Sequence, residues 1–471
     1  MSTFERLSFL DTSFLALEAP AIHMHVGAVA IFDGTHIQRP DGGLDIDRLR
    51  DFLAARLHLV PRYRQRLAWI PLEKYPVWVD DEHFDPEFHI RITALPRPGS
   101  DGQLKRLAGR IMSQQLDRAK PLWELWFVDG LADGRFALIS KIHHCMIDGV
   151  SGVDLMAMMY GLAPDPTILE PPTWTPRPTP SGAELVVGDV ARRLRSTIDR
   201  LTNAGQMFEE SQKVVMRTIR KATAVGQSLS SGWLRKGVVT PLNQHIGPNR
   251  RFEWTTMPLA DVKAVKNRLG GSLNDVILAI VAGAVRSFLI EHRDTDPDGM
   301  EYRAMAPVSV RTDDHRGTLG NQVAMWLVDL PISNDDPVAR LRHVTDITLN
   351  LKETEQALGA ATLVQLSSGA PVTLVSLASR LAAGRRPFAT TVTNVPGPQQ
   401  PLYLLESQLI HQFPLVPLWQ NHGYAIALFS YNQVLHWGIN ADWDLMPDTG
   451  AFVACLHASF EELTAAADQG A

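Results

Sequence analysis

The chain has 471 residues, of which 45% are apolar and 20% are charged, and its net charge is −6 with histidine neutral. This composition is typical of a globular protein and argues against a disordered or fibrous chain, while the negative charge gives no electrostatic reason to expect nucleic-acid binding. The length is sufficient for two domains of roughly 200 residues each.

The two cysteines, Cys145 and Cys455, are far apart and no C-x-x-C spacing occurs. Neither a disulfide scaffold nor a zinc module is therefore supported, and a reducing cytoplasm fits this usage. The first residues lack a basic segment followed by an apolar core, so we expect no signal peptide. The longest purely apolar run, 276–285, is about half the length that spans a bilayer.

The first part of the chain predicts a buried strand that is followed by two helices. Residues 7–18 are largely apolar, and His23-Met24-His25-Val26-Gly27 leads into an apolar run that ends at Asp33-Gly34. We interpret the two histidines, which share a strand face, as structural. Apolar residues at helical spacing predict helices over 46–59 and 103–116.

Two apolar and β-branched runs, 123–129 and 135–144, flank Leu131-Ala132-Asp133-Gly134, which predicts a β-hairpin with Asp-Gly at its turn. Pro121-Leu122-Trp123 starts the first of these strands, and its tryptophan is expected to be buried. The second strand ends in His143 and His144. Asp148-Gly149 follows four residues later, and helical spacing resumes over 150–159.

The histidine pair has more than one interpretation. Side chains alternate along a strand, so His143 and His144 point to opposite faces and only one can face a given substrate. An imidazole with an ordinary pKa of about 6.5 is suited to accept a proton from a hydroxyl, and the carboxylate of Asp148 can hold the bend. A core histidine beside a surface one is the structural alternative. A metal site is disfavoured, because neighbouring strand residues chelate one ion poorly.

Residues 163–182 contain seven prolines and are the clearest linker in the chain. Residues 184–225 then predict a long helical segment with eight Lys or Arg against five Asp or Glu. This segment suits an anionic membrane surface and equally a bridge between domains, and the sequence does not separate the two. We therefore divide the chain into domains 1–162 and 251–471, joined by 163–250.

The second half begins with a strongly apolar helix. Ser272 and Asp275 have the spacing of a capping box before the run from Val276 to Phe288, which leaves Asn274 free. Further elements follow in order: 307–311, 320–323, a strand at 390–393 with a Pro-Gly-Pro turn after Asn394, a hairpin over 424–440, and a C-terminal helix from Asp448.

Together these elements resemble the bacterial wax ester synthase/acyl-CoA:diacylglycerol acyltransferase family, part of the CoA-dependent acyltransferase superfamily. His143, His144, Asp148 and Gly149 match its His-His-x-x-x-Asp-Gly motif. The other similar elements occur in family order: the Met-His-Val-Gly stretch at 24–27, Pro121-Leu122-Trp123, 240–252, Asn274-Asp275, 307–311 and 320–323. Condensation domains of peptide synthetases share the motif, but no carrier or adenylation domain flanks it here.

The resemblance implies an α/β (α+β) fold of two chloramphenicol-acetyltransferase-like domains, each a mixed sheet flanked by helices, with the active site at their interface. His144 is expected to be the general base and Asp148 a structural carboxylate paired with Arg311, while Gly149 leaves the cleft floor open. His143 completes the motif. The implied supporting residues are Pro121, Leu122, Trp123, Asn274, Asp275, Arg311 and Asn394.

The implied reaction moves a long-chain acyl group from acyl-CoA to diacylglycerol, forming triacylglycerol, and to long-chain alcohols, forming wax esters. Direct attack is expected, because Cys145 points away from His144 and a covalent acyl-cysteine is disfavoured. Either Asn274, Asn394 or Thr393 stabilises the oxyanion. Acyl-CoA is a co-substrate, and neither a cofactor nor a metal is expected.

The expected location is cytoplasmic, with peripheral contact to the inner membrane face or to lipid inclusions or droplets. Two alternatives stay open: a catalytically weak protein of the same fold that binds lipid or acyl-CoA, and a condensation-type domain that forms amides. The intact motif favours an enzyme. Acceptor preference, acyl chain length and oligomeric state do not follow from the sequence.

Overall fold

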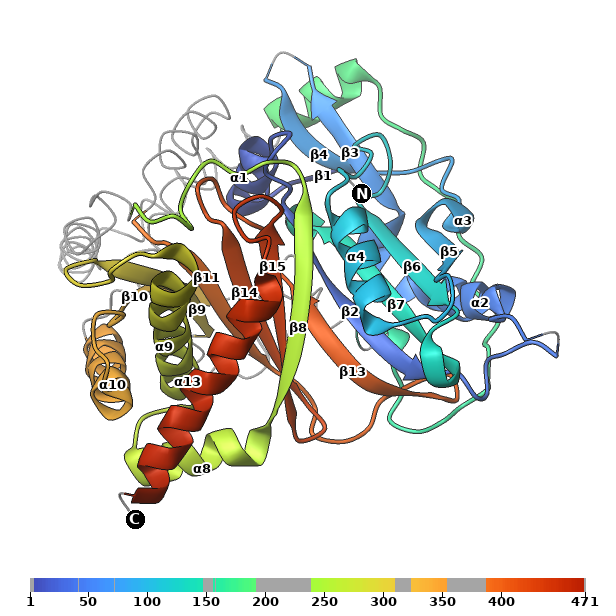
Figure 1. Ribbon diagram of the computed structural model, residues 1–471. Coiled ribbons are helices and arrows are strands. Elements are labelled where there is room, and N and C mark those ends of the chain that lie inside the picture. Colours follow the sequence, from blue (N-terminus) through green and yellow to red (C-terminus); the bar gives the residue numbers. More distant parts are fainter. Residues whose placement is uncertain are drawn as a thin grey trace, which may run out of the picture.

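A computed structural model describes residues 4–40, 42–71, 73–146, 156, 158–191, 239–309, 323–353 and 387–469. Two six-stranded mixed sheets lie next to each other, one in each half of the molecule (Figure 1). A three-stranded antiparallel sheet flanks the first half and consists of β1 (Glu5–Arg6), β4 (Tyr75–Asp80) and β3 (Gln65–Ile70). The predicted architecture of two mixed sheets flanked by helices is confirmed.

The N-terminal sheet has the strand order β12-β13-β2-β7-β6-β5. The predicted hairpin is present as the antiparallel pair β6 and β7. Its turn needs positive φ at Asp133 (61°) and Gly134 (67°), which Asp and Gly tolerate best. The strands are β2 (His25–Asp33), β5 (Ile90–Ala94), β6 (Trp123–Asp129), β7 (Arg135–His143), β12 (Tyr403–Leu404) and β13 (Ser407–Leu415).

The predicted helices of the first half are present, with shifted ends. The predicted helix over 46–59 is α-helical to Arg56 and continues as a 3₁₀ turn, and the predicted helix over 103–116 ends earlier, at Met112. The apolar opening segment, for which no helix was predicted, is helical from Phe9 to Leu17. The described helices are α1 (Phe9–Leu17), α2 (Ile46–Arg56), α3 (Pro86–His89) and α4 (Asp101–Met112), and the 3₁₀ turns are η1 (Leu57–Leu59), η2 (Pro61–Arg64), η3 (Ala132–Gly134) and η4 (His144–Met146).

The C-terminal sheet has the strand order β10-β9-β11-β14-β15-β8. Helices cover one of its faces (Figure 1). The elements are β8 (Arg250–Pro258), α8 (Leu259–Leu269), α9 (Leu273–Arg293), β9 (Tyr302–Ser309), β10 (Val323–Leu330), α10 (Pro337–Glu353), β11 (Thr390–Pro396), β14 (Tyr424–Tyr431), β15 (Val434–Asp442) and α13 (Thr449–Gln469). The predicted late hairpin is β14 with β15.

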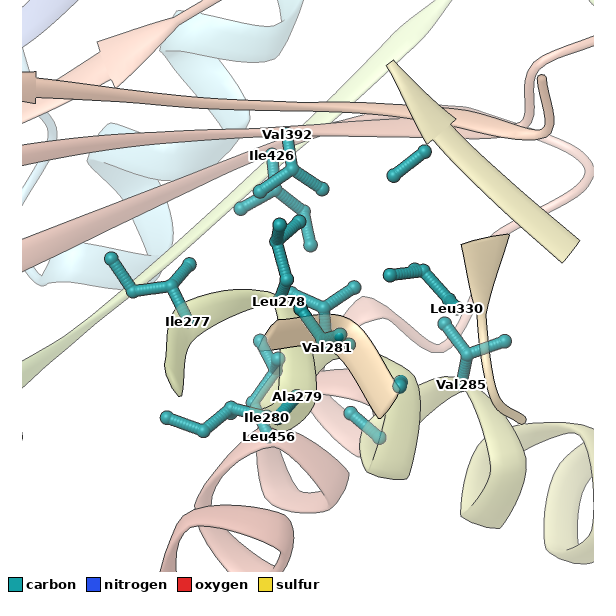
Figure 2. Packing of buried hydrophobic residues seen from close by; sticks show 14 of the residues in the cluster. Ile277, Leu278, Ala279, Ile280, Val281, Val285, Leu330, Val392, Ile426 and Leu456 are labelled. Atoms are coloured by element: carbon teal, nitrogen blue, oxygen red, sulfur yellow. The ribbon is translucent and has the colours of Figure 1, made fainter. Parts of the chain in front are cut away.

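Helix α9 forms the centre of the C-terminal core. The predicted capping box is present, because Ser272 and Asp275 exchange hydrogen bonds at its first turn. Its side chains pack on one side against sheet residues such as Val392 and Ile426 and on another against Leu456 of α13 (Figure 2). By length and hydropathy α9 is long enough to cross a membrane, but 72% of its most apolar window is buried inside the protein.

The halves are interlocked by strand β13. Our division assigned residues 403–415 to the C-terminal domain, but they contain the two outermost strands on one side of the N-terminal sheet, where β12 is the edge strand and β13 pairs with β2. On the other side of the junction, α4 packs against β8 closely enough that a Cβ on Gly109 would lie 2.7 Å from the Arg250 carbonyl oxygen. The first domain is therefore completed by a segment from far along the chain.

The Pro-rich linker runs in extended form along the small sheet. Arg177 donates to both carboxylate oxygens of Asp80, with its Nε 2.9 Å from Oδ2 and its Nη2 2.8 Å from Oδ1. Residues 182–191 are helical. The remainder of the helical segment predicted over 184–225 lies outside the described residues.

Candidate active site

The side chains of the two motif histidines lie in different places at the end of β7, as the alternation of strand side chains predicted. The strand ends at His143, one residue earlier than expected, and His144 begins the 3₁₀ turn η4. Both backbone amides are held, because His143 N–H donates to Leu122 O (2.9 Å) and His144 N–H donates to Met24 O (2.7 Å). The two rings therefore occupy different environments.

The ring of His143 is buried on the inner side of this turn. Its Nδ1 accepts a hydrogen bond from the Cys145 backbone N–H at 3.1 Å. Its Nε2 lies 3.6 Å from Oε2 of Glu18, whose side chain is only 3% exposed. One ring nitrogen thus accepts a backbone hydrogen bond and the other faces a buried carboxylate just beyond hydrogen-bond distance, so His143 is directed into the protein.

The ring of His144 stacks on Phe14 of α1, with centroids 3.9 Å apart and an interplanar angle of 27°. The residue is half-buried, and its Nδ1 is buried without a hydrogen-bond partner among the described residues. Burial lowers its pKa to about 4. The imidazole is therefore neutral near pH 7 and able to accept a proton.

His144 lies at the junction of the two halves. Phe14 and Met24, which contact its ring and its backbone, belong to an apolar cluster that also contains Met305 of β9, Phe388 and Trp419 of the C-terminal half. His144 is thus placed between the domains, as the resemblance implied, and its role as general base stays a prediction.

Buried histidines make stability depend on pH. Burial lowers the pKa of His144 and His436 to about 4, and that of His25 well below its usual value. The histidines of the unfolded chain take up protons near pH 6.5, whereas those of the folded chain stay neutral. The stability that these neutral histidines contribute is therefore complete above pH 6.5 and is lost as the pH falls. For His144 and His436, whose pKa falls from about 6.5 to about 4, each histidine costs about 2 kcal/mol of stability between pH 7 and pH 5. We expect the Tm to fall over this interval in calorimetry, and a constant or rising Tm would contradict the account.

The Pro121-Leu122-Trp123 element is attached directly to the histidine pair through the Leu122 carbonyl. Trp123 is fully buried, donates from Nε1 to Tyr63 O at 2.8 Å and stacks on His89 with centroids 4.6 Å apart. These contacts show that Trp123 packs in the N-terminal core and has a structural role there. Its predicted role in lining an acyl channel stays a prediction.

Asn274 and Asp275 lie in the first turn of α9. The Asp275 carboxylate is used structurally: Oδ2 accepts from Ser272 N–H (2.7 Å) and Oδ1 from Thr348 Oγ1 (2.8 Å). Asn274 is half-buried and keeps its side chain outside this network. Neither residue forms a hydrogen bond or ion pair with His144 within the described part of the chain, so their contact with substrate stays a prediction.

Asn394 and Thr393, two candidates for the oxyanion, lie on opposite faces of β11. Asn394 shares the face of Val392, which belongs to the helix-covered core. Thr393 shares the face of Thr391, the residue that pairs with Met305 beside the junction. Thr393 is therefore on the face of β11 that is directed toward the junction, and Asn394 is on the face directed toward the helices.

Asp148, Gly149 and Arg311 lie outside the described residues. The proposed pairing of Asp148 with Arg311 and the open floor at Gly149 therefore stay predictions.

Cys145 is unsuited to be a nucleophile. It is 1% exposed within the N-terminal core, and burial raises the pKa of its thiol well above the usual value. Elsewhere in the described residues, Glu291, His292 and Cys455 place potential metal ligands within 4.8 Å of one another. Burial raises the pKa of Cys455 to about 11, which disfavours the thiolate that a metal needs.

Sequence reasoning missed the three residues that hold the histidine pair, namely Phe14, Glu18 and Arg118. Phe14 and Glu18 are four residues apart, so they lie on the same side of α1. The available signal was a carboxylate at the end of a largely apolar segment that also contains Asp11, because buried charges are rare unless they are paired. Its partners come from β2, β7 and residue 118, which no local pattern connects.

Comparison with known proteins decides the family. The profile of the wax ester synthase/diacylglycerol acyltransferase catalytic domain matches residues 7–277, and that of the C-terminal domain of the same family matches residues 319–464. The chain belongs to this family. It is therefore an acyltransferase, and the assignment made from its motifs is confirmed.

Relatives of this family member align over almost its whole length. A protein of Mycobacterium tuberculosis named diacylglycerol O-acyltransferase is 30% identical over 98% of this chain and 96% of its own. A second one from the same organism is 31% identical over 99% of this chain and 91% of its own.

Solved structures agree with the fold of this acyltransferase. The wax ester synthase/diacylglycerol acyltransferase of Marinobacter aquaeolei has a TM-score of 0.69, with 25% identity over 98% of this chain and all of that one. The starter condensation domain of rhizomide synthetase, 11% identical over 99% of this chain and 95% of its own, has a TM-score of 0.60, which shows the shared fold alone.

Proposed function

We propose that this acyltransferase moves a long-chain acyl group from acyl-CoA to the free hydroxyl of diacylglycerol, forming triacylglycerol, and also to long-chain alcohols, forming wax esters. The family membership supports the substrate classes. The observation that carries the proposal is the neutral, half-buried ring of His144, held against Phe14 at the junction of the two halves.

The reaction proceeds by direct transfer. Because Nδ1 of His144 is buried, Nε2 is the nitrogen assigned to accept the proton of the acceptor hydroxyl. The hydroxyl oxygen attacks the thioester carbonyl carbon, and a tetrahedral intermediate forms. Its collapse breaks the C–S bond, and the imidazolium returns the proton to the leaving CoA thiolate. Thr393 and Asn274 are the candidates for stabilising the oxyanion.

Purified protein with palmitoyl-CoA and either dioleoylglycerol or hexadecanol tests this proposal. We expect equimolar release of free CoA and formation of triacylglycerol or wax ester, quantified by thiol titration and mass spectrometry. A parallel incubation with an amine acceptor controls for condensation-type chemistry. Binding of palmitoyl-CoA without ester formation would contradict the enzyme and favour the lipid-binding alternative, and amide formation would favour the condensation alternative.

The proposed location is the cytoplasm, with peripheral contact to the inner membrane face or to lipid inclusions. The support is chemical: both acceptors are insoluble in water, so the enzyme must meet them at a lipid surface. Fractionation of cells that express the tagged chain tests this location, and recovery in the lipid-free supernatant alone would contradict it.

A further inference from the structure

Glu18 is a buried carboxylate that the reaction outlined above does not use. It is the C-cap residue of α1, and its side chain is 3% exposed. Its Oε2 accepts from Arg118 at 2.5 Å (Nη2) and 3.0 Å (Nε), and His143 Nε2 lies 3.6 Å from the same oxygen. Its Oε1 lies 3.5 Å from Nε2 of His25.

The surroundings keep this carboxylate ionised. Burial raises the pKa of Glu18, but the contacts with His143 and Arg118 lower it by more, and the net result is a pKa of about 2. A buried anion is costly unless it is paired, so Glu18 needs the N–H groups that surround it. Across β2 and β7, His25 and His143 are direct strand partners, which brings both rings to the same carboxylate.

The proton positions on His143 follow from the geometry. Its Nδ1 accepts from the Cys145 backbone N–H, so Nδ1 carries a lone pair and the ring proton is on Nε2. That proton faces the Glu18 carboxylate. The result is a chain of contacts from Glu18 through the His143 ring to the backbone of Cys145, which is inside the turn that starts at His144.

Helix α1 therefore contacts the histidine pair twice. Phe14 covers the ring of His144, and Glu18, one helical turn later, contacts the ring of His143. Arg118 also donates to the Leu15 carbonyl oxygen at 3.1 Å, which fixes the end of the helix beside the carboxylate. Both rings are thus oriented by one element.

We propose that Glu18 is a positioning residue for acyl transfer: it holds His143 in the Nε2–H tautomer, and His143 in turn holds the turn that places His144 against the acceptor hydroxyl. This inference rests on the proposed function. Other carboxylates orient a catalytic imidazole by contacting it directly, whereas Glu18 contacts His143, the neighbour of the proposed base.

Glu18→Gln tests the proposal, because glutamine keeps the shape but has one acceptor oxygen and an NH₂ group that would face N–H donors. We expect kcat with palmitoyl-CoA and dioleoylglycerol to fall about 10- to 100-fold, the loss typical of a small misplacement of a catalytic group, with both KM values within about twofold of wild type. An unchanged kcat in folded Glu18→Gln protein would overturn the proposal.

A matched control separates positioning from general destabilisation. Asp80 is also buried and also paired with an arginine, Arg177, but it contacts neither motif histidine. Asp80→Asn should lower the Tm by a similar amount and leave kcat unchanged. In a His143→Ala background, Glu18→Gln should change kcat by less than about twofold, because the two residues act as one unit. A full additional loss would contradict action through His143.

A measurement on the wild-type protein covers the case in which Glu18→Gln fails to fold. In ¹⁵N NMR of histidine-labelled protein, with His143 assigned from a His143→Gln sample, we expect a protonated Nε2 and an unprotonated Nδ1. The opposite tautomer would overturn the proposal. This readout needs no substrate, so an absence of acyl transfer would count against the proposed function and leave the tautomer test intact.

Discussion

Replacing His144 with alanine should lower kcat for triacylglycerol formation about 10²- to 10⁴-fold, the range for loss of a general base. This corresponds to about 3 to 5.5 kcal/mol of activation free energy. In the proposed mechanism the neutral ring, held against Phe14, accepts the hydroxyl proton, and alanine offers no acceptor. The rate of CoA release with palmitoyl-CoA and dioleoylglycerol measures the effect.

A matched variant shows whether the loss is specific to His144. His436 is another buried histidine whose pKa burial lowers to about 4, but it lies on β15 beside His411 and contacts neither Phe14 nor Glu18. His436→Ala should keep kcat within a few-fold of wild type. Equal losses in the two variants, or full activity of His144→Ala, would remove the basis for His144 as the base.

Gly438→Ala should strongly destabilise the protein by forcing the two sheets apart. A Cβ at this position of β15 would lie 1.9 Å from the Pro414 carbonyl oxygen of β13, a distance that no side chain can accept. Both atoms belong to paired strands, so neither can move alone. Overpacking of this kind costs about 3 kcal/mol or more. We expect lower soluble yield and a Tm reduced by several degrees in calorimetry.

Gly450→Ala is the control for this change. Gly450 is near the start of α13, and a Cβ there has nothing within 4 Å. Alanine is the better helix former by about 1 kcal/mol, so the Tm should stay constant or rise slightly. If Gly438→Ala also left the Tm unchanged, the close approach of β13 to β15 would be wrong.

Local patterns predicted the elements whose causes are local. Turn chemistry predicted the Asp133-Gly134 turn, and helix capping predicted the capping box at Ser272. Strand alternation predicted that the side chains of His143 and His144 separate. All three features are present. The resemblance also implied that His144 lies at the domain junction, and the cluster around Phe14 places it there, while its role as a base stays a prediction.

Features that depend on distant parts of the chain were not predictable. Strand β13 returns from residue 407 to pair with β2, and no periodicity near Ser407 or His25 indicates that pairing. Glu18 is another case, because its partners are 7, 100 and 125 residues away in sequence. The opposite faces of Thr393 and Asn394 became clear only once the register of β11 was known.

The most direct test of the account is the pattern of initial rates over a grid of palmitoyl-CoA and dioleoylglycerol concentrations. Direct transfer at His144 requires both substrates to be bound together, so double-reciprocal plots should give intersecting lines. Parallel lines, together with an acyl group found on the protein after incubation with palmitoyl-CoA alone, would show a covalent intermediate and contradict one-step transfer.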